Sequence, residues 1–307
     1  MIKIWNKDIE CCSDRKKIED IQLERLRHMA CKAYENVPFY KKRFDESGIK
    51  PEMIKSLSDL KNLPFTTKED LRDNYPFGLF AEPMKNVVRL HASSGTTGKP
   101  VVAGYTKGDI EVLSEAIARI VTAGGIDEND VVQISFGYGL FTGGFGLHYG
   151  IEKVGATIVT MSSGNTQKQL MLMQDFGTTA LVATPSYAMY LSEMIKEKGI
   201  PRDNFKLKYG FFGSEAMSEK MREKLEDSMG ILVTSNYGLT EVMGPGVSGE
   251  CIYKCGEHIN EDMFIVEIID PKTGEVLPYG ESGEVVITTL TKEAMPVLRY
   301  RTRDISY

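Results

Sequence analysis

A glycine- and hydroxyl-rich segment at residues 91–106, HASSGTTGKPVVAGYT, has the side chains to bind a charged ligand. It brings two serines, three threonines, three glycines and one lysine around a turn. Unobstructed backbone N–H groups, hydroxyls and an ammonium are the groups that bind phosphate oxygens. A Walker A loop is excluded, because Gly95 and Gly98 are three residues apart and Pro100 follows Lys99. The segment predicts a nucleotide-phosphate loop, with a plain connection between strands as the alternative.

A second segment, FGYGLFTGGFGLHYG at residues 136–150, mixes aromatic side chains with many glycines. Such a mixture can form a flat apolar slot beside closely approaching backbone, and an aryl ring fits that shape. Packing in the core is the alternative, because aromatic residues of parallel-sheet proteins are commonly buried.

A third segment, ECIYKCGEH at residues 250–258, places Cys251, Cys255 and His258 within eight residues. Thiolates and imidazole suit Zn²⁺, but a structural zinc site needs four ligands and only three are present. A loop with two free cysteines is the alternative. The other three cysteines have no histidine at ligand spacing and are interpreted as ordinary thiols: Cys11, Cys12 and Cys31.

Helical and strand-like segments must position these residues. Residues 15–48 predict a helix that is broken at Pro38, and residues 66–74 predict another, with Thr66 or Thr67 capping an acidic first turn. After a helix over 107–124, five apolar runs alternate with helices, except for a glycine-rich bend between the first two: VVQISF, TIVTMSS, ALVATPS, YGFFGS and ILVTSNYG. This order predicts an α/β fold with a doubly wound, largely parallel sheet that carries ligand groups at the carboxyl ends of its strands.

The pattern changes at about residue 262. MFIVEIIDPKTGEVLPYGESGEVVITTL contains two β-rich runs joined by turns, with no helix between them. We expect a smaller antiparallel β subdomain over about 262–303.

Composition excludes several classes of protein. The 307 residues carry a net charge of -6 without a basic stripe, so nucleic acid is not an expected partner. No apolar run is typical of a membrane span, and the first residues lack the pattern of a signal peptide. We therefore expect a cytoplasmic protein with reduced cysteines.

Three motifs in this order and spacing resemble the adenylate-forming acyl-CoA synthetases: SSGTTGKP at 93–100, SNYGLTE at 235–241 and YRTRD at 300–304. Within that superfamily, four segments most resemble the phenylacetate-coenzyme A ligases: YENVPFYKKRF, LPFTTKEDLRDNYPFGLFA, FGYGLFTGGFGLHYG and SSGNTQKQ. The resemblance implies an ATP-dependent ligase that converts phenylacetate or a related aryl acid to its CoA thioester. An acyl-adenylate is the intermediate, and AMP and pyrophosphate are released. The implied cofactors are ATP, Mg²⁺ and coenzyme A, with Zn²⁺ as a further candidate.

The resemblance also assigns roles to individual residues. The β- and γ-phosphates would contact Ser93, Ser94, Thr96, Thr97 and Lys99. In the second motif, the ring of Tyr237 would lie against adenine, Thr240 would contact the α-phosphate and Glu241 would bind Mg²⁺, with Asn236 and Gly238 beside them. Asp304 would accept hydrogen bonds from the ribose hydroxyls. Taken without its motif, Glu241 would be interpreted as a solvated loop carboxylate.

The remaining assignments concern the acyl group. GSEAM at 213–217 would place Gly213, Ser214 and Glu215 beside the adenylate, although Glu215 could equally be a helix-start carboxylate. The aryl pocket would be lined by Phe136, Tyr138, Phe141, Gly144, Ser214 and Pro245.

The resemblance further implies that residues 1–303 form a large N-terminal domain and that 304–307 begin a hinge. A small C-terminal domain that carries the adenylation lysine would then lie outside this chain, and the whole protein would form a homodimer. A nucleotide- and acid-binding module with little turnover, and a ligase for a different aromatic acid, are the alternatives. A dinucleotide-dependent enzyme is disfavoured because no G-x-G-x-x-G motif opens a first βα unit.

Overall fold

The computed structural model describes residues 2–93 and 99–307. The chain divides into two compact units, each built from separate stretches of sequence. The first unit comprises Met1–Glu10, Leu113–Leu239 and Gly244–Ile259. The second unit comprises Cys11–Val112, Thr240–Met243 and Asn260–Tyr307, so the β-rich segment after residue 262 belongs with the N-terminal helices.

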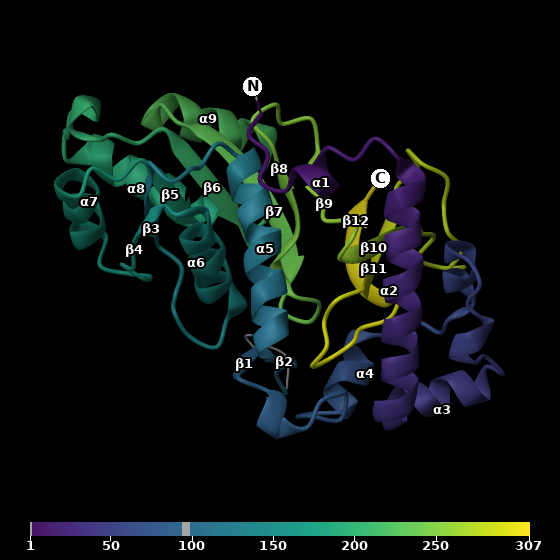
Figure 1. Ribbon diagram of the computed structural model, residues 1–307. Coiled ribbons are helices and arrows are strands. Elements are labelled where there is room, and N and C mark those ends of the chain that lie inside the picture. The colour runs from purple at the N-terminus through teal and green to yellow at the C-terminus, as the bar shows by residue number, and fades with distance from the viewer. Residues whose placement is uncertain (1, 94–98) are drawn as a thin grey trace. The chain divides into compact units, whose positions relative to one another are not determined.

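The first unit contains a seven-stranded sheet in the order β4-β3-β5-β6-β7-β8-β9 (Figure 1). Its first five strands are parallel to one another: β3 (Val131–Ile134), β4 (Thr157–Val159), β5 (Ala180–Ala183), β6 (Tyr209–Gly213) and β7 (Leu232–Leu239). β8 (Gly244–Glu250) and β9 (Glu257–Ile259) continue the sheet in antiparallel fashion. The predicted largely parallel, doubly wound sheet is confirmed. Strand β8 was not predicted, because the sequence GPGVSGE has the composition of a loop.

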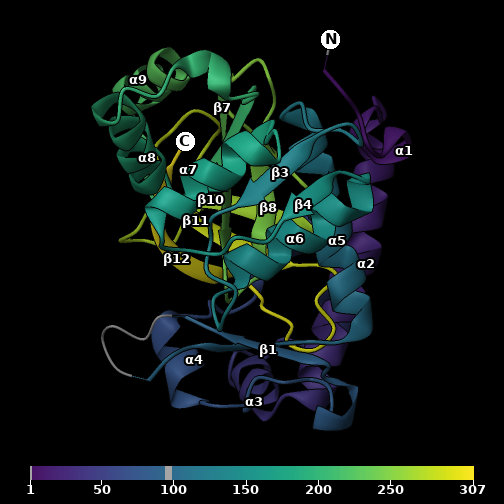
Figure 2. The ribbon, with the colours of Figure 1, turned by 90° about the vertical axis from the view of Figure 1, so that its left-hand side faces the viewer.

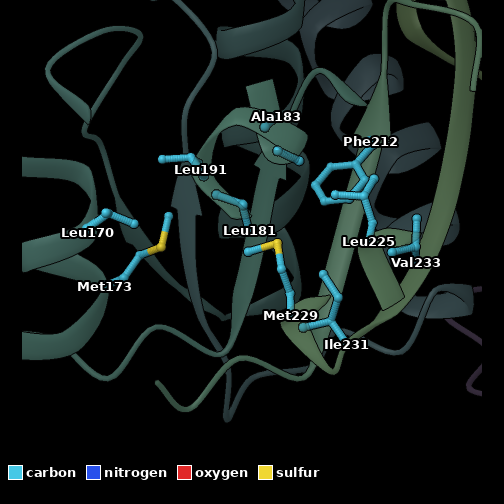
Figure 3. Packing of buried hydrophobic residues seen from close by; sticks show 11 residues of the cluster. Leu170, Met173, Leu181, Ala183, Leu191, Phe212, Leu225, Met229, Ile231 and Val233 are labelled. Atoms are coloured by element: carbon cyan, nitrogen blue, oxygen red, sulfur yellow. The ribbon is translucent and has the colours of Figure 1, made fainter. Parts of the chain in front are cut away.

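Five helices connect or flank these strands: α5 (Lys107–Ala123), α6 (Thr142–Val154), α7 (Thr166–Asp175), α8 (Pro185–Glu197) and α9 (Glu219–Met229). Of α5, residues 113–123 belong to this unit and residues 107–112 to the second. The unit also includes α1 (Lys7–Glu10) and the 3-10 helix η4 (Arg202–Asn204). Apolar side chains from α7, α8 and α9 meet those of β5, β6 and β7 in one core cluster (Figure 3). Burial of this cluster fixes the parallel strands, and with them the loops at their carboxyl ends.

The expected glycine-rich bend after β3 is confirmed only over residues 136–141, because residues 142–154 form helix α6. Its glycines permit close packing rather than a turn. A Cβ on Gly150 would lie 2.2 Å from Cβ of Ile117 in α5, and one on Gly146 would lie 3.1 Å from the Pro245 ring in β8. The low helix propensity of glycine is outweighed here by tertiary contacts that need the absence of a side chain.

The second unit contains helices α2 (Arg15–Asn36), α3 (Pro38–Glu46) and α4 (Lys68–Asp73). Short 3-10 helices follow at η1 (Pro51–Met53), η2 (Leu57–Asn62) and η3 (Met84–Asn86). The predicted break at Pro38 is confirmed. So is the cap of α4, where Thr67 Oγ1 accepts from the N–H of Asp70 and the Asp70 carboxylate accepts from the N–H of Thr67.

Among its described residues, two antiparallel sheets complete this unit. β1 (Arg89–Ala92) pairs with β2 (Val102–Tyr105), and β10 (Phe264–Ile269), β11 (Gly283–Thr289) and β12 (Tyr300–Ser306) lie side by side (Figure 2). The predicted antiparallel subdomain is thereby confirmed. Residues 304–306, the expected start of a hinge, continue strand β12.

The arginines near the end of the chain form ion pairs within this unit. Arg299 pairs with Glu267, Arg301 with Glu284 and Arg303 with Glu69. These ion pairs connect residues 299–303 to β10, β11 and α4. Over residues 2–93 and 99–307, no helix has the length and hydropathy to cross a lipid bilayer.

Candidate active site

The candidate residues are distributed over both units, and the motif SNYGLTE itself passes from the first unit into the second after Leu239. The acyl-pocket residues and the 213–215 segment belong to the first unit. Ser93, Lys99, Thr240, Glu241 and Asp304 belong to the second.

The order of the strands gives the parallel sheet a switch point at the carboxyl end of β3. β4 and β5 flank β3 on opposite sides, so the chain reverses direction across the sheet between them. In open α/β sheets, ligands bind outside the carboxyl ends of the strands at such a switch point. Residues 135–141, which follow β3, lie at this position.

Aromatic rings gather where β3 ends and α6 begins. The Phe136 and Phe141 ring centroids are 6.5 Å apart, and those of Tyr138 and Phe145 are 5.2 Å apart. Phe136 is buried, whereas Phe141 is 41% exposed. The Tyr138 hydroxyl lies 3.2 Å from Nδ1 of His148, and burial raises the pKa of Tyr138 to about 12. Of this group, the exposed ring of Phe141 is therefore the one most accessible to a ligand.

Two of the candidate pocket residues, Gly144 and Pro245, lie against neighbouring backbone or helix α6. A Cβ on Gly144 would lie 2.7 Å from the carbonyl oxygen of Gly137, so a side chain there would meet backbone rather than an open slot. Pro245 is buried in β8, close to Gly146 of α6. Both observations favour close packing of α6 as the reason for these residue types.

Residues 213–215, which the resemblance places beside the adenylate, begin at the carboxyl end of β6, next to β7. Gly213 is paired with Asn236 in register, and a Cβ on Gly213 would lie 2.8 Å from Oδ1 of Asn236. Asn236 donates from Nδ2 to the carbonyl of Phe212 (3.1 Å), which fixes its amide. The two strands and their glycine therefore hold Asn236 inside the sheet, opposite the last residue of β6.

The neighbouring Ser214 adopts a left-handed backbone conformation with φ of 68°. The Glu215 carboxylate accepts from the N–H of Ser186, in the first turn of α8, at 3.2 Å. The alternative role of a helix-start carboxylate thus describes Glu215, although the helix is α8 rather than α9, which follows it in sequence.

Gly238 and Tyr237 lie in the part of β7 that adjoins β8. A Cβ on Gly238 would lie 1.8 Å from the carbonyl oxygen of Gly244, so no larger residue fits there without moving the backbone. Tyr237 is half-buried. The close approach explains the glycine of the motif structurally.

In the second unit, Glu241 is 5% exposed, and Thr240 is buried to the same degree. The Tyr300 hydroxyl donates to Oε1 of Glu241 (3.3 Å), and Nζ of Lys68 lies 3.9 Å from the same oxygen. The structure thus gives Glu241 a buried, partnered position rather than that of a solvated loop carboxylate.

A residue that the sequence analysis missed, Lys292, lies against this segment. Its side chain is fully buried, and Nζ donates to the carbonyl oxygen of Glu241 at 3.2 Å. Burial lowers the pKa of Lys292 to about 8, opposed by the carboxylates of Asp109 and Glu241. A lysine within the otherwise largely apolar run LTKEAMPVL was the only local signal.

The phosphate loop is described only at its two ends. The N–H of Ser93 donates to the carbonyl of Val101 (2.9 Å), and the N–H of Val101 donates to Oγ of Ser93 (3.0 Å). Nζ of Lys99 lies 5.4 Å from the centroid of the Tyr75 ring. Ser94, Thr96 and Thr97 lie outside the described residues. Asp304 is exposed on β12, and its N–H donates to Oγ1 of Thr302 (3.0 Å).

The three candidate zinc ligands are not brought together. Cys251 is buried, Cys255 is exposed with Sγ 3.3 Å from the carbonyl of Tyr253, and His258 is exposed on β9. Throughout the described part of the chain, no three histidine, cysteine, aspartate or glutamate side chains are arranged to hold a metal ion. Cys251 and Cys255 are free thiols.

Two cavities lie away from the candidate residues. One open pocket of about 500 Å³ is lined by α8, α9 and the loop at 200–207, and another of about 620 Å³ is lined by β4, α7 and neighbouring residues. Neither is lined by a residue that the motifs single out. Strand ends and motif geometry, rather than cavity size, therefore define the candidate site.

Comparison with known proteins identifies the class. Residues 28–291 match the family model for AMP-binding enzymes. The chain therefore belongs to the AMP-binding enzyme family, and its fold is that of the adenylate-forming enzymes, as expected.

Two curated relatives share about half of their residues with this chain. Phenylacetate-coenzyme A ligase of Aromatoleum evansii is 54% identical over 291 residues, which are 94% of this chain and 66% of that protein. Phenylacetate-coenzyme A ligase of Escherichia coli (strain K12) is 48% identical over 292 residues, 94% of this chain and 67% of that protein. The chain thus spans about two thirds of the length of these relatives.

A solved structure shares the fold. The 2-hydroxyisobutyryl-CoA ligase in complex with 2-HIB-AMP and CoA, in its thioesterification state, has a TM-score of 0.91 and 27% sequence identity. The match covers 96% of this chain and 64% of that one.

Proposed function

We propose that this chain is the nucleotide- and acid-binding part of an ATP-dependent acid–thiol ligase that acts on phenylacetate or a related aryl acid. The observation that carries the proposal is the 54% identity to a phenylacetate-coenzyme A ligase over 94% of the chain. Since the chain spans about two thirds of that relative, the proposal for these 307 residues is binding of nucleotide and acid. Turnover is proposed for the whole protein.

The proposed reaction has two displacements. A carboxylate oxygen of the acid attacks the α-phosphorus of ATP, so that an O–P bond forms and the bond to pyrophosphate breaks. The thiol of coenzyme A then attacks the acyl carbon; a C–S bond forms, AMP leaves and the thiol proton passes to solvent. Phosphate contacts from Ser93, Lys99 and Thr240 would stabilise the charge that develops in the first step.

Glu241 is the proposed ligand of Mg²⁺. A carboxylate is a hard oxygen donor of the kind that Mg²⁺ prefers, and this one is held in place by Tyr300. Mg²⁺ bound with ATP would neutralise phosphate charge. Tyr237 would contact adenine and Asp304 would accept hydrogen bonds from the ribose.

The test is direct measurement of binding. Calorimetric titration of the 307-residue chain should show binding of AMP, and of ATP with Mg²⁺, in the micromolar-to-millimolar range. Asp304→Ala should weaken AMP binding by about 1–3 kcal/mol, because it removes a charged acceptor. Asp227→Ala, at an exposed position on α9, is the matched control and should change nothing. Absence of nucleotide binding in the wild-type chain would refute the proposal.

The acid is tested separately. Melting curves with a panel of arylacetic and benzoic acids, each with ATP and Mg²⁺, should show the largest stabilisation for phenylacetate or a close analogue. A larger shift with another aromatic acid would reassign the substrate. We also propose that the protein is cytoplasmic. We further propose that the whole protein is a homodimer, which sedimentation would test.

A further inference from the structure

Lys292 follows strand β11, outside the three motifs, and its ammonium is enclosed by the second unit. Nζ donates to the carbonyl oxygen of Glu241 at 3.2 Å and lies 4.6 Å from the centroid of the Tyr105 ring. A fully buried lysine is rare, because removing an ammonium from water is costly unless other groups compensate. Here the compensation comes from a carbonyl and a ring face, together with the nearby negative charges of Asp109 and Glu241.

The same neighbourhood fixes the chain on both sides of this contact. The Tyr105 hydroxyl donates to the carbonyl oxygen of Met243 at 3.1 Å. The buried Asp109 carboxylate accepts from the backbone N–H groups of Glu293 (2.6 Å) and Ala294 (3.0 Å), directly after Lys292. Asp109 thus fixes the main chain next to Lys292. Lys292 and Tyr105 in turn bind the carbonyls of Glu241 and Met243.

The direction of the Glu241 carboxylate depends on this backbone. Its Oε1 accepts from the Tyr300 hydroxyl in strand β12. A tilt of the peptide at Glu241 would turn the carboxylate away from that partner. Sub-ångström placement of charged groups at a nucleotide site decides how well they bind metal and phosphate.

We propose that Lys292 is a positioning residue, which holds the main chain at Glu241 so that the Glu241 carboxylate is presented to the Mg²⁺ of a bound nucleotide. This inference rests on the proposed function. It differs from a space-filling role for Lys292, because it requires the hydrogen bond to the Glu241 carbonyl and not merely the volume of the side chain.

The test uses Lys292→Met, which keeps the volume and removes the donor. Lys272→Met, in an exposed turn of the same unit, is the matched control. The Kd of AMP without metal should change less than twofold, whereas the Kd of ATP with Mg²⁺ should rise at least tenfold, as for Glu241→Gln. The double variant Lys292→Met/Glu241→Gln should be no weaker than Glu241→Gln alone, because both changes disable one carboxylate.

A second readout does not depend on any ligand. Amide hydrogen exchange of residues 240–243 should accelerate at least tenfold in Lys292→Met, with exchange in β5 unchanged and Lys272→Met like the wild type. Lys292→Gln, which is one bond shorter and also loses the contact, replaces Lys292→Met if the latter does not melt cooperatively.

The outcomes separate the inference from the function. Equal losses of AMP and Mg²⁺–ATP affinity, or unchanged Mg²⁺–ATP affinity, would overturn the positioning role. If the wild-type chain binds no nucleotide, the proposed function fails. Hydrogen exchange then decides whether Lys292 holds residues 240–243, and unchanged exchange overturns that holding role as well.

Discussion

Two adjacent glycines in the first turn of α6 should respond differently to the same substitution. A Cβ on Gly144 would lie 2.7 Å from the carbonyl oxygen and 3.2 Å from the carbonyl carbon of Gly137. A Cβ on Gly143 would lie 2.6 Å from Cε1 of Phe141, a ring that is 41% exposed and can rotate away. Alanine at position 144 therefore displaces backbone, and alanine at position 143 displaces only a side chain.

The expected free energies follow from two opposing effects. Gly→Ala in a helix gains about 0.5–1 kcal/mol from the lower conformational entropy of the unfolded chain. Forcing atoms into a filled space costs about 1–3 kcal/mol. We expect Gly144→Ala to destabilise the chain by about 0.5–2 kcal/mol and Gly143→Ala to be neutral or slightly stabilising.

The measurement is urea unfolding of both variants, followed by far-ultraviolet circular dichroism and by near-ultraviolet signals from the aromatic residues. Two probes are needed because a chain with two compact units need not unfold in one step. Titration of each folded variant with phenylacetate shows whether movement of residues 137–138 reaches the proposed acyl site.

The reasoning about α6 is refuted if Gly144→Ala is as stable as Gly143→Ala or more stable. It would then follow that residue 144 faces open space, as a pocket residue would. In that case a larger side chain at 144 becomes the better test of the aryl slot.

Three further predictions concern stability. Burial raises the pKa of Tyr40 to about 12, so the unfolded chain loses this phenolic proton first; between pH 10 and 12, stability should fall by up to about 3 kcal/mol. Urea titrations at several pH values should show a shallower fall in Tyr40→Phe, and equal slopes would contradict this. Arg222→Met should cost about 3–5 kcal/mol in urea unfolding, because it leaves the buried Glu250 carboxylate without its guanidinium; adding Glu250→Gln should recover part of the loss, and a cost below about 1 kcal/mol would count against the ion pair. Thr67→Ala removes the cap of α4 and should lower the unfolding free energy by about 1 kcal/mol, with Thr273→Ala in an exposed turn as a comparison.

Features governed by neighbouring residues were readable from the sequence. The cap of α4 needs only Thr67 and Asp70, three residues apart, and the end of α2 needs only the proline at 38. Alternation of apolar runs with helices predicted the parallel part of the sheet, and turn residues predicted the antiparallel strands after 262. The motifs predicted the family, since their order and spacing are properties of the chain itself.

Features that depend on distant residues were not readable. The glycine-rich sequence of helix α6 is locally typical of a bend. It forms a helix because its glycines pack against Ile117 and Pro245. Strand β8 forms because β7 and β9 hydrogen-bond to a sequence with little strand propensity. Local propensity is weak in both places, so tertiary contacts decide the structure.

The candidate site divides in the same way. The sequence by itself determined which residue types are present: the glycines and hydroxyls of the loop, the carboxylate of Glu241 and the aromatic residues after β3. Only the tertiary structure decided that Glu241 is buried against Tyr300, that Gly144 faces the carbonyl of Gly137, and that Lys292 contacts a residue 51 positions away. The physical reason is that burial, partners and charge compensation arise where separate segments meet, and no local pattern encodes that meeting.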